Sequence, residues 1–436
     1  MDEQRIAAMY LNLFTGWLNR IWHGIFSRGL RRSPALPWIV IFILVGLPSL
    51  GWYLHRRGQF ATLKRDLKGQ QQTSSVPVPS PGGMEPIVLK RSLTPGAATP
   101  ELTSVTVLPG LGMDVLQLTA NLPGRGDTAL FADPTVEEMA DNSAPPRNGL
   151  YDTHGAIEAP WGGLLFGLVS PIGTSMTFNW ADHQVQVPTD VVARGIDASG
   201  LLARTAVDSQ QTTTLDDGAV ATGVVRASNF DEHWPGRLDL QVSVELGPSD
   251  LNIILTARNT GATPVPFGAG WHPRFQVLSG SAQAIQIRLP EGQQLGLADS
   301  AKDLPSGRIE APSAEVARLQ SRAASPGATS LEATLVHLRP GMLDTLPAAE
   351  FRDPLAGYGL RLTSQSPATR ALRVVAPAQG GYVSLGMQTN FDDPFGREWD
   401  GAEGSGMVTL LPGQTFQWKI RLEVFPVRHS ESPINN

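Results

Sequence analysis

The sequence predicts an all-β protein in which one large antiparallel β-sandwich makes up most of the chain. From about Glu101 onward, short runs rich in Val, Leu and Thr alternate with clusters of Gly, Pro, Asn and Asp, which are turn residues. Leu238–Leu246 alternates apolar and polar residues at every step, as a strand with one buried face does. Long helices do not alternate with these runs, so a parallel α/β fold is disfavoured.

The individual elements follow from the same pattern. One helix is expected over Ala314–Ala323, because Ser313 is a good N-cap and Val316 and Leu319 share a face. The runs expected to form strands are Thr103–Leu108, Val115–Ala120, Leu164–Leu168, Met176–Trp180, Val220–Ala227, Leu238–Leu246, Leu251–Arg258, Ala284–Leu289, Gly359–Thr363, Ala371–Ala376, Tyr382–Met387 and Thr415–Val424.

An uncharged stretch, residues 33–54, precedes these strands and predicts one transmembrane helix. About 20 apolar residues span a bilayer core, and Trp38, Trp52 and Tyr53 lie near its two ends, where interfacial aromatic residues belong. A cleaved signal peptide is the alternative. It is disfavoured because the preceding region is too long and no A-x-A-like cleavage site follows.

This stretch divides the chain into parts. We expect a basic, interfacial segment over residues 1–32, the helix over 33–54, a linker rich in Pro, Ser, Gln and Gly over 55–100, the β-sandwich over 101–428 and a tail over 429–436. A single N-terminal anchor followed by a tether usually serves an exported domain. We therefore expect a single-pass protein of a bacterial-type inner membrane with a periplasmic domain, and a membrane protein complex as a partner.

Composition excludes several function classes. Residues 1–70 hold ten Lys/Arg and three Asp/Glu, so the remainder of this chain of net charge −6 is acidic. An acidic body argues against a nucleic-acid partner, and the basic end suits a membrane surface. The chain has no cysteine, which rules out disulfides, thiolate nucleophiles and cysteine-ligated zinc. The histidines lack metal-ligand spacing, so no metal and no cofactor are expected.

The stretch Asn259–Phe275 contains the strongest candidate for chemistry. Pro273 disfavours a helical conformation for His272 and favours an extended one. Gly268 and Gly270 lack side chains and allow close backbone approach. His272 is therefore expected at a strand end in a crowded place, either as a satisfied core histidine or as a proton-transfer group.

The order N-x-G, P, H-P-x-F in this stretch resembles the aldose 1-epimerase (galactose mutarotase) family. His154, followed by Gly155, falls where that family has its first active-site histidine, and His272 falls at the second. Leu411-Pro-Gly-Gln is similar to the family's closing segment, and the resemblance covers about residues 101–425. It implies a galactose mutarotase-like β-supersandwich that interconverts the α and β anomers of a free aldose by acid/base ring opening.

The resemblance also implies residue roles. His272 would give a proton to the ring oxygen of a small-molecule sugar, and His154 would hydrogen-bond near it. Asp344, after Leu343, resembles the aspartate that binds sugar hydroxyls, although a surface turn aspartate is the slightly favoured alternative. The remaining expected substrate-binding residues are Trp161, Trp271, Arg274, Gln388 and Asn390, of which the aromatic ones would stack on sugar C–H faces.

One position departs from the family pattern. Gly386 falls where the family has its catalytic Glu, and glycine cannot move a proton. We assign Glu398 as the replacement base, with Asp392 or Asp393 as alternatives. Otherwise the protein is a catalytically inactive carbohydrate-binding or sensing module tethered to a membrane complex. Together with Asp400, these acidic residues also suit a Ca²⁺ ion or a simple solvated loop.

Overall fold

The computed structural model describes residues 78–140, 155–170, 175–180, 183–188, 196–197, 200–299, 304–342, 344–399 and 404–428. The chain divides into two compact units, Met1–Val78 and Pro79–Asn436, and all described residues except Val78 belong to the second. The predicted segments 1–32 and 33–54 and the tail 429–436 lie outside the described residues. Within the described ranges, no helix is long and apolar enough to cross a membrane.

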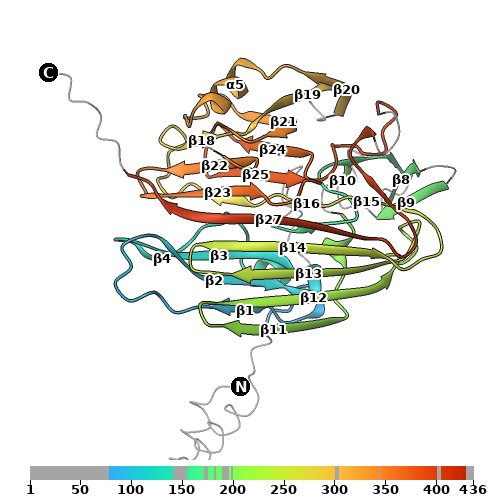
Figure 1. Ribbon diagram of the computed structural model, residues 1–436, viewed down its shortest axis with the longest axis horizontal. Helices are drawn as coiled ribbons and strands as arrows, with labels where there is room; N and C mark the ends of the chain where they lie inside the picture. The colour runs from blue at the N-terminus through green and yellow to red at the C-terminus, as the bar shows by residue number, and fades with distance from the viewer. Residues whose placement is uncertain are drawn as a thin grey trace, which may run out of the picture. The chain divides into compact units, whose positions relative to one another are not determined.

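Two large antiparallel sheets and four smaller ones form the described part of the second unit. Figure 1 looks onto the first sheet, with β14, β27 and β23 across its middle. Its strands in spatial order are β11 (Ser209–Leu215), β12 (Gly218–Ser228), β13 (Leu238–Leu246), β14 (Asp250–Asn259), β27 (Thr415–Pro426), β23 (Tyr358–Ser364), β22 (Ala348–Asp353) and β18 (Gln286–Arg288).

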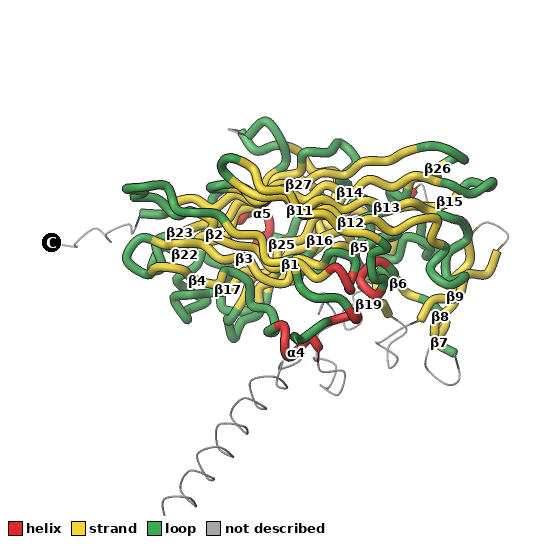
Figure 2. The backbone as a smooth tube through the Cα atoms, turned by 90° about the horizontal axis from the view of Figure 1, so that it is seen from below, coloured by secondary structure: helices red, strands yellow, loops and turns green. Residues whose placement is uncertain are grey.

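The second sheet carries the candidate site. Its order is β20 (Leu304–Glu310), β19 (Glu291–Asp299), β21 (Leu331–Arg339), β24 (Ala371–Ala376), β25 (Tyr382–Gln388), β16 (Gly270–Trp271) and β5 (Ile157–Glu158), and β17 (Arg274–Gln276) also pairs with β25. The third sheet consists of β1 (Ile87–Lys90), β2 (Glu101–Leu108), β3 (Asp114–Leu122) and β4 (Gly126–Ala129). Figure 2 shows β27, β14 and β13 in one layer and β25, β16 and β5 in the layer below it.

Short elements complete the unit. β6 (Leu165–Phe166) pairs with β10 (Ile196–Asp197), β15 (Val265–Phe267) pairs with β26 (Val408–Leu410), and β7 (Leu168–Val169), β8 (Ser175–Trp180) and β9 (His183–Pro188) form a three-stranded sheet. The helices among the described residues are α4 (Val136–Ala140), α5 (Ala314–Ser321) and the single 3₁₀ turns η2 (Pro81–Gly83), η3 (Pro109–Leu111) and η4 (Leu202–Arg204).

Period-two alternation builds the core between the two large sheets. Along β27, Trp418, Ile420 and Leu422 are buried, whereas Lys419 and Arg421 between them are not. Along β25, Val383, Leu385 and Met387 join the same hydrophobic cluster. The intervening residues of both sheets therefore lie on faces that point away from the shared core. The antiparallel sandwich predicted from the sequence is confirmed.

Two local predictions have different outcomes. The helix α5 has the expected cap, since the Ser313 hydroxyl accepts a hydrogen bond from the Val316 N–H, and Val316 and Leu319 are buried. By contrast, β1 lies inside the stretch predicted as linker. It pairs in register with β2, and Leu89 contributes to the core. A strand with one core residue is too short to stand out from a Pro-rich background, so the compact unit begins before residue 101.

Candidate active site

His272 lies at an interruption between two short strands. β16 ends at Trp271 and β17 begins at Arg274, because Pro273 between them has no N–H to donate. The Trp271 side chain points into the core, where its ring packs edge-on against Phe131 at 6.0 Å between centroids. Successive strand residues face opposite sides, so His272 is directed to the face of the second sheet that points away from the core. We call this the outer face of the second sheet.

The strand register gathers polar residues on this face. Gly270 lies opposite Gln388 on one side and Glu158 on the other, and Arg373 lies opposite Gly386. Glu158 and Gln388 are fully buried, and Arg373 is 2% exposed. Strands β5, β16, β25 and β24 thus bring chemistry-bearing residues together from segments far apart in the sequence.

Glu158 and His272 form a buried pair. The Nδ1 atom of His272 lies 2.8 Å from Oε1 of Glu158, and the side chains are 2% and 0% exposed. The second carboxylate oxygen, Oε2, accepts a hydrogen bond from the Gly163 N–H at 2.6 Å. Among the described residues, the Nε2 atom of His272 has no hydrogen-bond partner. The pair therefore presents one ring nitrogen as its unsatisfied atom.

Burial and the attraction between the two side chains both shift the pKa values of Glu158 and His272. Burial raises the pKa of Glu158, and His272 offsets this only in part. Burial alone lowers the pKa of His272, but the carboxylates of Glu158 and Asp392 together outweigh it, so the pKa ends above its ordinary value. Because Glu158 accepts from Nδ1–H, the favoured charged form is an imidazolium with a second proton on Nε2.

Gly386 provides the space that the imidazole ring occupies. A Cβ atom added at this position would lie 1.7 Å from Cδ2 of His272, far inside any allowed contact. Gly386 does not have a positive φ, so the need for glycine here is steric. The residue that departs from the family pattern is therefore the one that lets His272 lie flat across β25 and reach Glu158.

Asp392 and Arg373 adjust the charge around the pair. Asp392 accepts hydrogen bonds from the Thr334 hydroxyl at 2.9 Å and from the Gln388 amide at 3.2 Å, and Arg373 Nη1 lies 3.5 Å away. Asp392 raises the pKa of His272 and Arg373 lowers it. Asp392, weighed above as a base, is thus occupied by donors and serves as an electrostatic neighbour of His272.

Comparison with known proteins places this geometry in a family. The family model for aldose 1-epimerase matches residues 177–423, which is more than half of the chain. The chain belongs to the aldose 1-epimerase family. No curated protein sequence matches it.

Solved structures of this family share its fold at low sequence identity. A galactose mutarotase-like protein from Clostridium acetobutylicum is 15% identical, with 77% of this chain and 98% of that chain covered and a TM-score of 0.58. A putative aldose 1-epimerase from Escherichia coli K12 is 16% identical, with 78% and 99% covered and a TM-score of 0.54. An aldose epimerase homologue from C. elegans is 15% identical, with 75% and 96% covered and a TM-score of 0.53. These likenesses establish the galactose mutarotase-like fold.

The aromatic residues expected to stack on a sugar lie inside this epimerase-family fold. Trp161 is fully buried and stacks on Trp234 at 5.6 Å between ring centroids. Trp271 is fully buried in the core, and its indole N–H donates to the backbone oxygen of Gly155 at 2.8 Å. Neither ring offers a free face, so both stabilise the scaffold of the site.

The polar residues expected to bind sugar divide into two groups. Gln388 lies on the outer face near His272, and its Oε1 has no partner among the described residues. Asn390 is structural, because its amide donates to the Gly162 oxygen at 2.7 Å and accepts from the Gly162 N–H at 2.9 Å. Arg274 lies over the ring of Tyr382, 5.0 Å from its centroid. Of the three, Gln388 is the one that the structure brings to the His272 pair.

Asp344 lies elsewhere. Its carboxylate is bound by Arg288 at 2.8 Å and by Arg361, which are side chains of the first sheet. Arg288 and Arg361 alternate with core residues and so point away from the sandwich interior. Asp344 is therefore on the opposite outer face from His272 and does not join a site built on it.

His154 lies outside the described residues, as does Leu343. The residue next to His154 is held firmly, because the Gly155 oxygen accepts hydrogen bonds from the indole of Trp271 and from the Val115 N–H at 3.2 Å. A Cβ at Gly155 would lie 2.3 Å from the Val115 oxygen.

Glu398, the residue assigned as the replacement base, faces Asp393. Burial and the Glu398 carboxylate raise the pKa of Asp393 to about 8, and none of the described contacts joins Glu398 to His272. The Oδ1 atom of Asp393 accepts from the Phe166 N–H at 3.1 Å. Within the described residues, no group of three or more His, Cys, Asp or Glu could hold a metal ion; Asp400 of the acidic cluster lies outside them.

This carboxyl pair predicts a pH-dependent stability. Asp393 has a pKa of about 8 in the folded state against an ordinary value of 3.8, so between these pH values the folded state holds a proton that the unfolded state releases. The contribution of Asp393 to the free energy of unfolding is fully present below about pH 4. It falls as the pH rises towards 8, by at most about 1.4 kcal/mol per pH unit. Asp393→Asn should flatten the loss of stability over this window, measured by urea unfolding at several pH values. Identical pH slopes for the two proteins would contradict the assignment.

The sequence did not reveal Glu158. It lies four residues after His154 in a Gly- and Pro-rich stretch and belongs to a strand of two residues. Its partner is 114 positions away. The sequence feature that could have indicated Glu158 is the pair Ile157-Glu158, in which an apolar and a polar residue stand directly before a Pro- and Gly-rich turn.

Proposed function

We propose that this protein is an aldose 1-epimerase acting on a free sugar, with His272 as the proton-transfer residue and Glu158 as its carboxylate partner. The observation that carries the proposal is the buried Glu158–His272 pair whose Nε2 lacks a partner among the described residues. A buried polar atom without a partner costs about 1–3 kcal/mol. Such a cost is common where a substrate completes the hydrogen bonding.

The chemistry needs a proton donor at the ring oxygen. The imidazolium of His272 gives its Nε2 proton to the ring oxygen O5 as the C1–O5 bond breaks and its electron pair moves to O5. The anomeric hydroxyl loses its proton to water, and C1 becomes an aldehyde carbon. After rotation about C1–C2, O5 adds to the other face of C1, His272 takes its proton back, and the new anomeric oxygen is protonated by water.

Glu158 prepares His272 for this role. A carboxylate on Nδ1 orients the ring, fixes which nitrogen faces the substrate and stabilises the imidazolium. Gly386 replaces the carboxylate expected on β25, so the carboxylate of the pair comes from β5 instead. The Glu158 carboxylate contacts His272, which is the proton donor, and water therefore serves as the base. We expect a slower epimerase than one with both groups in place.

Polarimetry tests this function. The full chain, kept in a detergent without a sugar head group, is added to freshly dissolved α-D-glucose or α-D-galactose, and the rate of optical change is compared with buffer. We expect acceleration that falls to the buffer rate in His272→Ala. His337→Ala is the matched control, because His337 is exposed on β21 and bonds to Gln293. Equal rates for His272→Ala and the unaltered protein would refute the role of His272.

Gly386 favours a second candidate. A site that has lost the carboxylate on β25 can retain sugar binding without turnover, as a carbohydrate-binding or sensing module. Calorimetry on the same samples separates the two functions. Sugar binding without any acceleration of mutarotation would support the binding module and contradict the epimerase function.

We also propose that residues 33–54 anchor the protein in a bacterial-type inner membrane, with the β domain in the periplasm, where it could join a membrane protein complex. The support is the uncharged length of this stretch and its flanking aromatic and basic residues. Protease added to intact spheroplasts should cut the β domain. Full protection in intact spheroplasts, together with cleavage after lysis, would reverse the orientation.

A further inference from the structure

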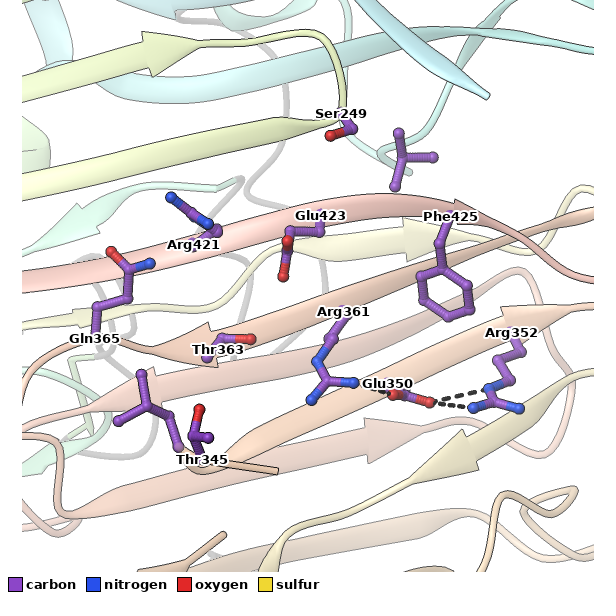
Figure 3. A pocket seen from close by; sticks show the side chains of 12 residues that line it. Ser249, Thr345, Glu350, Arg352, Arg361, Thr363, Gln365, Arg421, Glu423 and Phe425 are labelled. Atoms are coloured by element: carbon purple, nitrogen blue, oxygen red, sulfur yellow. Dashed lines mark hydrogen bonds and ion pairs between the residues drawn. The ribbon is translucent and has the colours of Figure 1, made fainter. Parts of the chain in front are cut away.

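A hollow of about 630 Å³ lies on the outer face of the first sheet, on the opposite side of the sandwich from His272. Figure 3 shows side chains from β22, β23 and β27 gathered around it. Its volume is within the roughly 300–1,000 Å³ of ligand pockets. The proposed epimerase function does not use this face.

The strand register explains which side chains meet here. Glu423 of β27 lies opposite Arg361 of β23, and Arg361 lies opposite Glu350 of β22. In the next row, Arg421 lies opposite Thr363. Alternation sends these side chains outward, because the residues between them fill the core. The face is therefore a ladder of charged and hydroxyl groups fixed by backbone pairing.

A network of ion pairs holds one wall in place. Glu350, 3% exposed, accepts from Arg352 at 2.5 Å and from Arg361 at 2.9 Å. Arg361 also binds Asp344. Arg361 thus turns away from Glu423, its neighbour across the strands, and among the described residues that carboxylate has no ion pair.

Several polar groups in the hollow are left for a ligand. Among the described residues, the buried Oγ1 of Thr363 has no hydrogen-bond partner. The side chains of Glu423 and Gln365 also line the hollow, and no hydrogen bond or ion pair joins either to another described residue. A carboxylate, an amide and a hydroxyl together offer both donors and acceptors. Hydroxyl groups, which donate and accept, suit such a set.

An apolar wall completes the hollow. The Phe425 ring lies over Gly359, where a Cβ would be 2.4 Å from the ring. The guanidinium of Arg352 lies 5.7 Å from the centre of this ring. Leu346, 41% exposed, lies at another edge. Aromatic and aliphatic side chains pack against the C–H faces of sugars, which are apolar.

From this arrangement we infer a second carbohydrate-binding site, which takes a neutral oligosaccharide chain. Each of the three arginines that line the hollow lies within 3.5 Å of a carboxylate oxygen, so the hollow holds no unpaired cation to attract a polyanion. Its open position on a sheet face suits a chain that continues beyond the hollow. The site is independent of His272 and would hold the protein on a glycan while the other face acts on free sugar.

Calorimetry with three probes tests the inference: maltoheptaose, cellohexaose and dextran sulfate, each added to the full chain in a detergent without a sugar head group. We expect one of the neutral oligosaccharides to bind, and Glu423→Ala with Gln365→Ala to weaken that binding at least tenfold. Thr363→Val should weaken it too. Lys419→Ala is the matched control, since Lys419 is on β27 two residues from Arg421 and does not line the hollow.

Binding should be unchanged in His272→Ala, and it should persist even if polarimetry shows no epimerase activity. Failure of both neutral oligosaccharides to bind would overturn the inference. So would binding of dextran sulfate alone, or neutral binding that the hollow variants leave intact.

Discussion

Replacing Gly386 with alanine is expected to abolish epimerase activity and to destabilise the fold by roughly 3 kcal/mol or more. The new Cβ would meet Cδ2 of His272 at 1.7 Å, so the ring must leave its position. Its departure removes the partner of the buried Glu158 carboxylate. Overpacking typically costs about 1–3 kcal/mol, and breaking a buried ion pair costs about 3–5 kcal/mol.

A double-mutant cycle isolates this effect. In a His272→Ala background the ring is absent, so Gly386→Ala should cost far less in free energy of unfolding, measured by urea denaturation. An equal cost in both backgrounds would mean that the glycine is needed for some other reason.

Glu158→Gln is expected to lower kcat/KM for mutarotation by about 10²–10⁴ while the protein remains folded. The amide has the shape of the carboxylate but no charge, so it no longer stabilises the imidazolium. Without the Glu158 charge, burial acts on His272 and lowers its pKa. Because the proton donor is the charged form, activity should be lost at a lower pH than in the unaltered protein, as a pH–rate profile will show.

Glu398→Gln is the matched control for this change. It removes a carboxylate from the acidic loop that follows β25, and the described contact of Glu398 is with Asp393. We expect a near-normal rate. A normal rate in Glu158→Gln and a large loss in Glu398→Gln would restore Glu398 as the base that the sequence indicates.

The sequence predicts the fold well where a strand has one buried face. Leu238–Leu246 became β13 with those bounds, because each polar residue meets the outside of the sheet. The run Leu164–Leu168 did not become one strand; β6 and β7 divide it and pair with different partners. The polar strand β19 was not predicted, since Gln293 and Gln294 give no apolar signal near the edge of a sheet.

For the site, the local sequence pattern predicts His272 but not Glu158. His272 stands out because proline follows it and glycines precede it. Glu158 is brought to it only by pairing of β5 with β16, which no local pattern encodes. The same limit explains why Asp344 was expected at the site. Its Leu-Asp motif is local, whereas its position beside the first sheet depends on the topology of the whole fold.

The most direct test of the central claim is ¹⁵N NMR of the full chain labelled at histidine, with and without saturating D-glucose or D-galactose. The signals of His272 are those missing from His272→Ala. We predict that the Nε2 resonance of His272 shifts when sugar binds, whereas Nδ1, held by Glu158, shifts little. Unchanged Nε2 and Nδ1 resonances in a sample that accelerates mutarotation would show that another atom carries the proton.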